Sequence, residues 1–253
     1  MSRALATGDL LTLDRGNSAL KADVWKGDTI VETVVMPPAS IIRQLKCLVN
    51  RHHLKAAMYC SVTDDGSQIN EVFDEADIPF MFMTKESPMS LTIDYKTPES
   101  LGVDRIAGCA GAHHLFPGKE LLVVDLGTAI TYDRVTSDGH FIGGNIAPGV
   151  SLRLKALNAF TARLPKVTLE GDVPKWGYDT DTALRSGAIR GIAAELSFYH
   201  SLLPKGSIAV LTGGSAPRIE PYLDFKHVME PHLVSIGLKT CLDKLVKETL
   251  TTV

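Results

Sequence analysis

Two short stretches of the chain place an aspartate directly after an apolar run and follow it with glycine and a small polar residue. They read LLTLDRGNS (residues 10–18) and LLVVDLGTA (residues 121–129), and their aspartates, Asp14 and Asp125, stand 125 − 14 = 111 residues apart. The N–H groups and hydroxyls of such a hairpin tip can bind phosphate oxygens, and its carboxylate can bind a cation directly or through water. One copy alone would fit an ordinary turn. Two copies in register favour a pair of hairpins that grip the phosphates and metal of one nucleotide, an arrangement suited to phosphoryl transfer.

The elements that must position these hairpins follow the same order in both halves of the chain. In each half an apolar strand, a second strand, a tight turn and a third strand precede helices of regular apolar spacing. The strands are expected at residues 10–13, 19–25, 29–35, 56–62, 79–83, 121–124, 130–136, 140–144 and 207–211. The main helices are expected at residues 39–51, 106–115, 150–160, 182–203 and 234–250.

This succession predicts a duplicated α/β architecture with mixed sheets flanked by helices. Pro117-Gly118 directly precedes the second copy, and two such strong breakers mark a seam. The sequence therefore predicts an N-terminal α/β domain at residues 1–117 and a C-terminal α/β domain at residues 118–253.

Composition excludes several classes of partner. The chain has 253 residues, is 45% hydrophobic and carries a formal net charge of −3, so it has no electrostatic attraction to nucleic acid or to an anionic membrane. No apolar run approaches the roughly 20 residues that span a bilayer, and the first residues lack the apolar run of a signal peptide. The four cysteines are widely spaced and form no CxxC pair, which indicates reduced thiols. We expect a cytoplasmic protein without a nucleic-acid or membrane partner.

The paired Asp-x-Gly hairpins resemble those of the acetate and sugar kinase, Hsp70 and actin superfamily. The resemblance implies two actin-like ATPase (ribonuclease H-like) domains. The segment TGGS at residues 212–215 is similar to the adenosine-contacting glycine loop of that group, although it also fits a plain strand-to-helix turn. The chain contains no G-x-x-x-x-G-K-[ST] motif, so it is not a P-loop kinase.

Within that superfamily the chain resembles type III pantothenate kinase over most of its length. Five segments match the family's motifs in order: DRGNSALK (14–21), LGVDR (101–105), DLGTAITYD (125–133), GGNIAPGV (143–150) and YDTDTALRSG (178–187). The resemblance implies an ATP-dependent enzyme that phosphorylates pantothenate to 4′-phosphopantothenate, the first step of coenzyme A biosynthesis. It also implies a homodimer that requires Mg²⁺ and a monovalent cation, K⁺ or NH₄⁺.

The resemblance implies a role for individual residues. Asp104 matches the general base, Asp14 matches the acid that organises Mg²⁺ through water, and Asp125 matches the ligand of the monovalent cation. The residues expected to bind ATP are Asp14, Arg15, Gly16, Asn17, Ser18, Ala19, Leu20, Lys21 and Thr128. The residues expected to bind pantothenate are Tyr95, Gly102, Val103, Asp104, Arg105 and Thr180.

Several of these residues also fit structural roles. Considered alone, Asp104-Arg105 fits a surface pair of opposite charges, Tyr95 fits an aromatic residue of an edge strand, and Thr180 fits a helix N-cap. Two positions depart from the family's pattern. Arg15 replaces a small or aliphatic residue, and its cation could contact phosphate or point to solvent. Asp179 replaces asparagine, which removes an amide donor and adds a charge near the expected pantothenate pocket.

Two other functions remain open at this point. A kinase or phosphatase of the same superfamily could act on another small alcohol or acid. Alternatively, the chain could be a catalytically inactive accessory or regulatory relative that keeps the fold.

Overall fold

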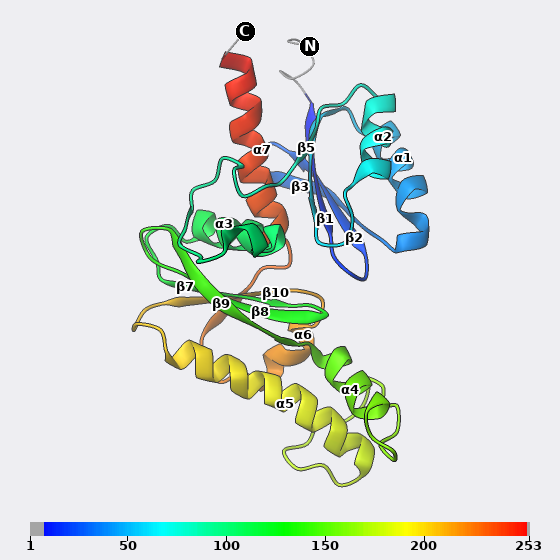
Figure 1. Cartoon of the computed structure of the whole chain (residues 1–253), viewed down its shortest axis with the longest axis vertical. Coiled ribbons are helices and arrows are strands. Elements are labelled where there is room, and N and C mark those ends of the chain that lie inside the picture. Colours follow the sequence, from blue (N-terminus) through cyan, green and yellow to red (C-terminus); the bar gives the residue numbers. More distant parts are fainter. Residues whose placement is uncertain (1–7, 252–253) are drawn as a thin grey trace. The chain divides into compact units, whose positions relative to one another are not determined.

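The computed structural model describes residues 8–251, and their side chains up to residue 248. The chain forms two compact units, Met1–Phe116 with His232–Val253, and Pro117–Pro231. Each unit contains a mixed β-sheet with helices packed on it (Figure 1).

The sheet of the first unit has the strand order β3-β2-β1-β4-β5. β1 pairs antiparallel with β2 and parallel with β4. The strands of this sheet are β1 (Asp9–Arg15), β2 (Leu20–Lys26), β3 (Thr29–Met36), β4 (Leu54–Ser61) and β5 (Phe80–Phe82). The short β6 (Thr92–Ile93) lies in the same part of the chain but is not a strand of this sheet. The helices of this unit are η1 (Pro38–Ser40), α1 (Ile41–Arg51), α2 (Ser67–Glu75), η2 (Pro98–Ser100), α3 (Val103–Leu115) and α7 (Leu233–Thr251).

The two faces of this sheet carry different helices. Leu11 and Leu13 of β1 belong to one buried cluster with Leu45 of α1 and Phe73 of α2. Side chains alternate along a strand, so the intervening Thr12 points to the other face, where its hydroxyl hydrogen-bonds Ser235 of α7. One face of the first sheet is therefore covered by α1 and α2, and the other by α7.

The second unit repeats this plan. Its strands β9-β8-β7-β10-β11 follow one another in the same relation as β3-β2-β1-β4-β5, with β7 antiparallel to β8 and parallel to β10. The strands are β7 (Leu121–Leu126), β8 (Ala129–Val135), β9 (His140–Pro148), β10 (Ile208–Thr212) and β11 (His227–Met229). The helices are α4 (Val150–Ala159), α5 (Thr180–Ser201), α6 (Ala216–Ile219) and η3 (Glu220–Tyr222).

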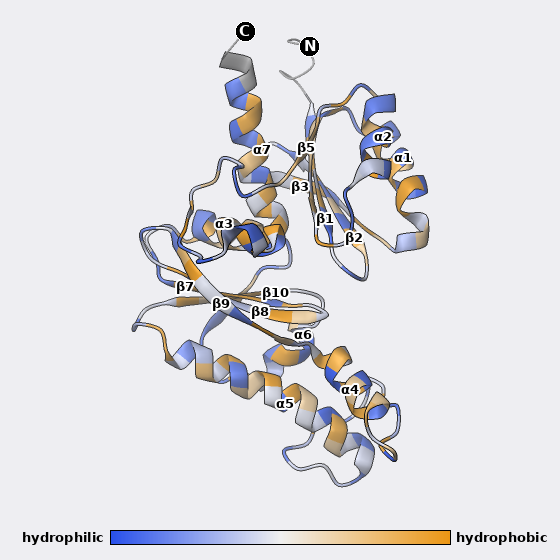
Figure 2. Ribbon diagram, in the orientation of Figure 1, coloured by the Kyte–Doolittle hydropathy of each residue, from blue (hydrophilic) through white to orange (hydrophobic). Residues whose placement is uncertain are grey.

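The apolar pattern of the helices explains why they bury one face. Ile189, Ile192 and Leu196 of α5 recur at helical spacing and pack with Leu122 and Val124 of β7. Figure 2 shows polar and apolar residues alternating along α5 and α7, as expected of helices with one buried face. Within residues 8–251, no helix is both long and apolar enough to cross a bilayer.

The structure differs from the expected domain division at the C-terminal end. The two units divide between Phe116 and Pro117, and α7 packs on α3, β1 and β4 of the first unit instead of joining the second. Two glycines explain how closely α7 and α3 approach. A Cβ on Gly237 would overlap the carbonyl oxygen of Ala107, and one on Gly111 would overlap that of Leu233.

This close approach predicts the effect of a small substitution. Gly111→Ala should lower the free energy of unfolding by about 1–3 kcal/mol, because the added methyl must push two helix backbones apart. Gly187→Ala in α5 is the matched control, since a Cβ there meets nothing within 4 Å. The control should be neutral or stabilising by about 0.5–1 kcal/mol. Urea unfolding followed by circular dichroism measures both, and an unchanged stability of Gly111→Ala would contradict the close α3–α7 contact.

Candidate active site

The first Asp-x-Gly hairpin closes β1 onto β2. The N–H of Gly16 donates to the carbonyl of Ala19 at 3.1 Å, which leaves Asn17 and Ser18 exposed at the tip. Asp14 stands opposite Lys21 of β2 and, across the parallel pair, opposite Cys60 of β4. The expected phosphate-binding segment is thus a tight turn at the carboxyl end of β1.

The structure brings two of the predicted acids to the same buried cysteine. Burial raises the pKa of the Cys60 thiol well above its ordinary value, and the neighbouring carboxylates of Asp14 and Asp104 raise it further. The thiol therefore stays neutral and acts as a packing group. Asp14 and Asp104 are 90 residues apart in the sequence (104 − 14 = 90), yet the carboxylates of both lie near enough to Cys60 to raise its pKa.

Asp104 is held at the start of α3. It lies in the first turn of the helix, where acidic side chains are favourable, and its Oδ1 accepts the N–H of Arg105 at 2.8 Å. Gly102 is the N-cap, and a Cβ on it would lie 2.5 Å from Asp104 Oδ1. The absence of a side chain at Gly102 therefore leaves room for the Asp104 carboxylate in this position.

Tyr95 and Arg105 also lie together. The Arg105 side chain is buried, and its guanidinium carbon is 5.8 Å from the centre of the Tyr95 ring, within the range of a cation–π contact. Tyr95 follows β6 by two residues, so it is not part of that strand. The predicted pantothenate residues of the first unit, Tyr95 and Gly102 to Arg105, thus gather around the start of α3.

The second hairpin is packed against two glycine segments of its own unit. Asp125, at the end of β7, lies beside Thr212 of β10. Gly213 has φ +91°, and a Cβ there would overlap Asp125 Oδ1. Gly149, directly before α4, donates its N–H to the carbonyl of Thr128 at 2.9 Å, and a Cβ there would overlap the carbonyl oxygen of Gly127. Only glycine fits at these two positions, which indicates that the hairpin backbone packs tightly against the TGGS loop and the start of α4.

Comparisons with known proteins decide the family. The type III pantothenate kinase family model matches residues 10–200. The chain belongs to the type III pantothenate kinase family. A type III pantothenate kinase from Phocaeicola vulgatus is 37% identical over 241 residues, which cover 93% of this chain and 99% of that relative.

Solved structures show the fold. A conserved putative Baf family transcriptional activator from Campylobacter jejuni has a TM-score of 0.64 at 20% identity, covering 93% of this chain and 98% of its own. The activator of the 2-hydroxyisocaproyl-CoA dehydratase from Clostridium difficile was solved with bound ADPNP. It has a TM-score of 0.57 at 10% identity, covering 97% of this chain and 98% of its own. The expected duplicated actin-like α/β fold is confirmed.

One departure from the pattern of type III pantothenate kinases lies at the start of α5. Asp179 is the N-cap of this helix: its Oδ1 accepts the Thr182 N–H at 2.8 Å, and Asp179 and Thr182 form a capping box. The backbone N–H and then the hydroxyl of Thr182 lower the pKa of Asp179 below its ordinary value. Thr180 is the first residue of the helix and is exposed, so the alternative in which Thr180 is the cap does not hold.

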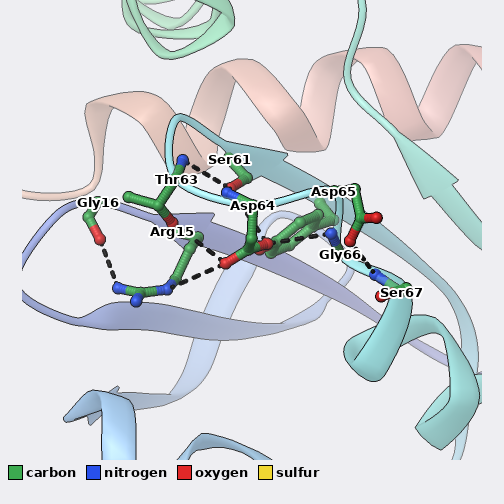
Figure 3. Close-up of polar contacts among 9 residues, drawn as sticks. Arg15, Gly16, Ser61, Thr63, Asp64, Asp65, Gly66 and Ser67 are labelled. Carbon is green, nitrogen blue, oxygen red and sulfur yellow. Dashed lines mark hydrogen bonds and ion pairs between the residues drawn. The ribbon is translucent and has the colours of Figure 1, made fainter.

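The other departure lies on the first hairpin. Arg15 does not extend into solvent; its side chain is only 11% exposed and forms an ion pair with Asp64 beyond β4 (Figure 3). The sequence did not predict Asp64 as a partner of Arg15. The only signal in this loop was an Asp-Asp-Gly segment at residues 64–66 after a buried strand, which did not identify Arg15 as a partner of Asp64.

The cap at Asp179 predicts a pH-dependent contribution to stability. Because its folded pKa is depressed, Asp179 stabilises the fold above the ordinary carboxyl pKa, and this contribution is lost as pH falls through the lowered folded pKa. Asp179→Ala should lower the melting temperature at pH 7, and its difference from wild type should shrink in acid. Asp179→Asn should retain most of the stability, because asparagine also caps helices well. Thermal melts from pH 7 to pH 3 test this, and equal melting of wild type and Asp179→Ala at pH 7 would contradict the cap.

Proposed function

We propose that this chain phosphorylates pantothenate with ATP, forming 4′-phosphopantothenate in the first step of coenzyme A biosynthesis. The observation that carries the proposal is the match of residues 10–200 to the type III pantothenate kinase family. The placement of Asp14 and Asp104 near Cys60, whose pKa both carboxylates raise, is consistent with it. One acid next to a phosphate-binding turn and one next to an acceptor-binding helix start are the parts that transfer of a phosphoryl group to an alcohol requires.

Asp104 is the proposed general base. It accepts the proton of the substrate's primary hydroxyl as that oxygen bonds to the γ-phosphorus of ATP, while the bond from the γ-phosphorus to the bridging oxygen breaks and ADP leaves. The contact of its Oδ1 with the Arg105 N–H holds the carboxylate at the first turn of α3. This geometry leaves the second carboxylate oxygen, Oδ2, to accept the proton.

The residues around Asp104 suit a substrate that carries a carboxylate. A guanidinium can bond both carboxylate oxygens, and the Tyr95 ring beside Arg105 restricts its orientation. We assign pantothenate binding to Tyr95, Gly102, Val103 and Arg105, and propose that Thr180, exposed at the start of α5, adds a hydroxyl.

We assign the nucleotide and its cations to residues of the two hairpins. Among the residues that the structure describes, no three His, Cys, Asp or Glu side chains form a metal cluster. Mg²⁺ is usually held by one or two carboxylates together with water and substrate phosphates, so Asp14 beside the phosphate-binding turn is a sufficient donor. When bound, Mg²⁺ neutralises phosphate charge. We propose that residues 16–21 and Thr128 bind ATP, and that Asp125 binds K⁺ or NH₄⁺.

The proposed reaction is cytoplasmic. Three of the four cysteines, Cys60, Cys109 and Cys241, are buried free thiols, and none of the four forms a disulfide. Reduced cysteines are typical of cytosolic proteins.

The activity prediction concerns Asp104 and its neighbour Gly102. Purified protein should transfer phosphate from ATP to pantothenate in the presence of Mg²⁺ and K⁺. Asp104→Asn should lower kcat by roughly 100-fold or more. Gly102→Ala should also lower kcat, by on the order of tenfold to 100-fold, because its methyl displaces the Asp104 carboxylate. Both variants should melt near wild type, since Gly102 has an ordinary backbone conformation.

Three outcomes would each contradict a different part of this prediction. Turnover with another alcohol but not with pantothenate would overturn the substrate. Full activity of Asp104→Asn would overturn the base. ATP binding without any turnover would instead support a regulatory relative that has lost catalysis.

We also propose a homodimer formed through the second unit. Five large apolar side chains on α4 and between α4 and α5 are exposed: Leu152, Leu157, Phe160, Trp176 and Tyr178. Phe160 and Trp176 are each 89% exposed, and exposed large apolar side chains grouped in one part of a chain are typical of a protein interface. Burial against a second copy would explain them.

The dimer prediction uses the most exposed of these side chains. Trp176→Ser combined with Phe160→Ser should shift the protein from dimer to monomer in size-exclusion chromatography with light scattering. Val35→Ser is the matched control, because Val35 is also an exposed apolar residue but lies on β3 of the first unit. A wild-type monomer, or a dimer that persists in the double variant, would contradict the proposed interface.

A further inference from the structure

Arg15 lies on the opposite side of the first sheet from the acid that precedes it. Side chains alternate along β1, so Arg15 follows Leu11 and Leu13 on the face covered by α1 and α2. Asp14 follows Thr12 on the other face, where it lies near Cys60 and Asp104. The Arg15 guanidinium is therefore separated by the sheet from the acids of the proposed active site.

On its own face Arg15 contacts two groups. Its Nη1 donates to the carbonyl oxygen of Gly16, and its Nε lies 3.6 Å from Asp64 Oδ2. The same side chain lines a cavity of about 310 Å³ together with Ile41, Ile42 and Ile69 from α1 and α2. The packing of α1 and α2 keeps the Arg15 guanidinium on the face of the hairpin that is opposite to Asp14.

Asp64 is anchored independently of Arg15. Its carboxylate accepts the Tyr59 hydroxyl at 2.5 Å, the Thr63 hydroxyl at 3.1 Å and the Gly66 N–H at 3.0 Å (Figure 3). Burial raises the pKa of Asp64, but these three hydrogen bonds and the Arg15 charge outweigh it and lower the pKa below its ordinary value. The ionised Asp64 carboxylate therefore has a defined position, and Arg15 forms its ion pair with it there.

The loop that carries Asp64 is itself tightly packed. Gly66 has φ +70°, and a Cβ on it would lie 2.7 Å from ring atoms of both Tyr59 and Phe82. Asp65 accepts the Ser67 N–H at 3.1 Å at the start of α2. The loop between β4 and α2 therefore gives Asp64 a defined position relative to the sheet.

The contact with Gly16 determines the direction of the next peptide. The carbonyl of Gly16 and the N–H of Asn17 belong to one planar trans peptide and point in opposite directions. Because Arg15 holds the Gly16 carbonyl toward the α1 and α2 face, the Asn17 N–H points away from that face, toward the side of Asp14.

From this geometry we propose that Arg15 is a positioning residue for ATP: pinned by Asp64, it orients the Gly16–Asn17 peptide for phosphate binding and does not contact phosphate itself. The inference rests on the proposed function, because it takes residues 16–21 as the phosphate-binding turn. It assigns a role to Arg15, one of the two residues at which this chain departs from the family's pattern.

A double-mutant cycle separates positioning from direct contact. Arg15→Gln removes the cation, and Asp64→Asn removes the ionic partner while keeping an oxygen that accepts from Tyr59 and Gly66. Each single change should raise KM for ATP by roughly three- to tenfold, and the double variant should resemble either single variant, because both break one interaction. KM for pantothenate and the melting temperature should change little.

Lys46→Gln is the matched control. Lys46 of α1 pairs with Glu75 of α2 at 2.6 Å on the exposed surface of the same unit, so its loss should leave KM for ATP unchanged. Titration with a non-hydrolysable ATP analogue by calorimetry repeats the cycle without an acceptor. Failure of the pantothenate assay would therefore leave this test intact.

Two results would overturn the proposal. If Arg15→Gln weakens ATP binding while Asp64→Asn does not, or if the two effects multiply in the double variant, Arg15 contacts phosphate directly. If neither change affects ATP binding, the pair does not position the turn.

Discussion

The parallel pairing of the first strand of each unit with a later strand is the interaction on which the rest of the structure depends. β1 pairs with β4 and places Asp14 beside Cys60, and β7 pairs with β10 and places Asp125 beside Thr212. Parallel strands end at the same edge of a sheet, so each pairing brings the loop after the later strand to the Asp-x-Gly hairpin. The same kind of strand pairing therefore forms both hairpin sites, although the residues that it brings to each hairpin differ.

The two hairpins differ in the contacts that they make with the loop after the later strand. In the second unit the TGGS loop comes after β10, and Gly213 allows its backbone to approach Asp125. In the first unit the loop after β4 is rich in carboxylates and hydroxyls, and Asp64 pairs with the hairpin through Arg15. One hairpin is supported by close backbone packing and the other by an ion pair, which is consistent with different roles for Asp14 and Asp125.

The elements were largely predictable from the sequence because their signals are local. The hairpins and the amphipathic helices α1, α5 and α7 lie within a few residues of their expected positions. The packing of α7 on the first unit was not predictable, because the fit of Gly237 against Ala107 joins residues 237 − 107 = 130 positions apart. The Arg15–Asp64 pair was missed for the same reason, and the Asp179 cap because a capping box with threonine at its last position is a weak signal.

The alternation of side chains along β1 explains how the chain accommodates an arginine next to a proposed active-site acid. A cation on the face of Asp14 would compete for that carboxylate with any bound cation. On the opposite face the same cation lies beside aliphatic side chains of α1 and α2 and the polar loop between β4 and α2, where Asp64 supplies an opposite charge. Arg15 and Asp64 therefore form one ion pair that supports the hairpin from the face opposite to Asp14.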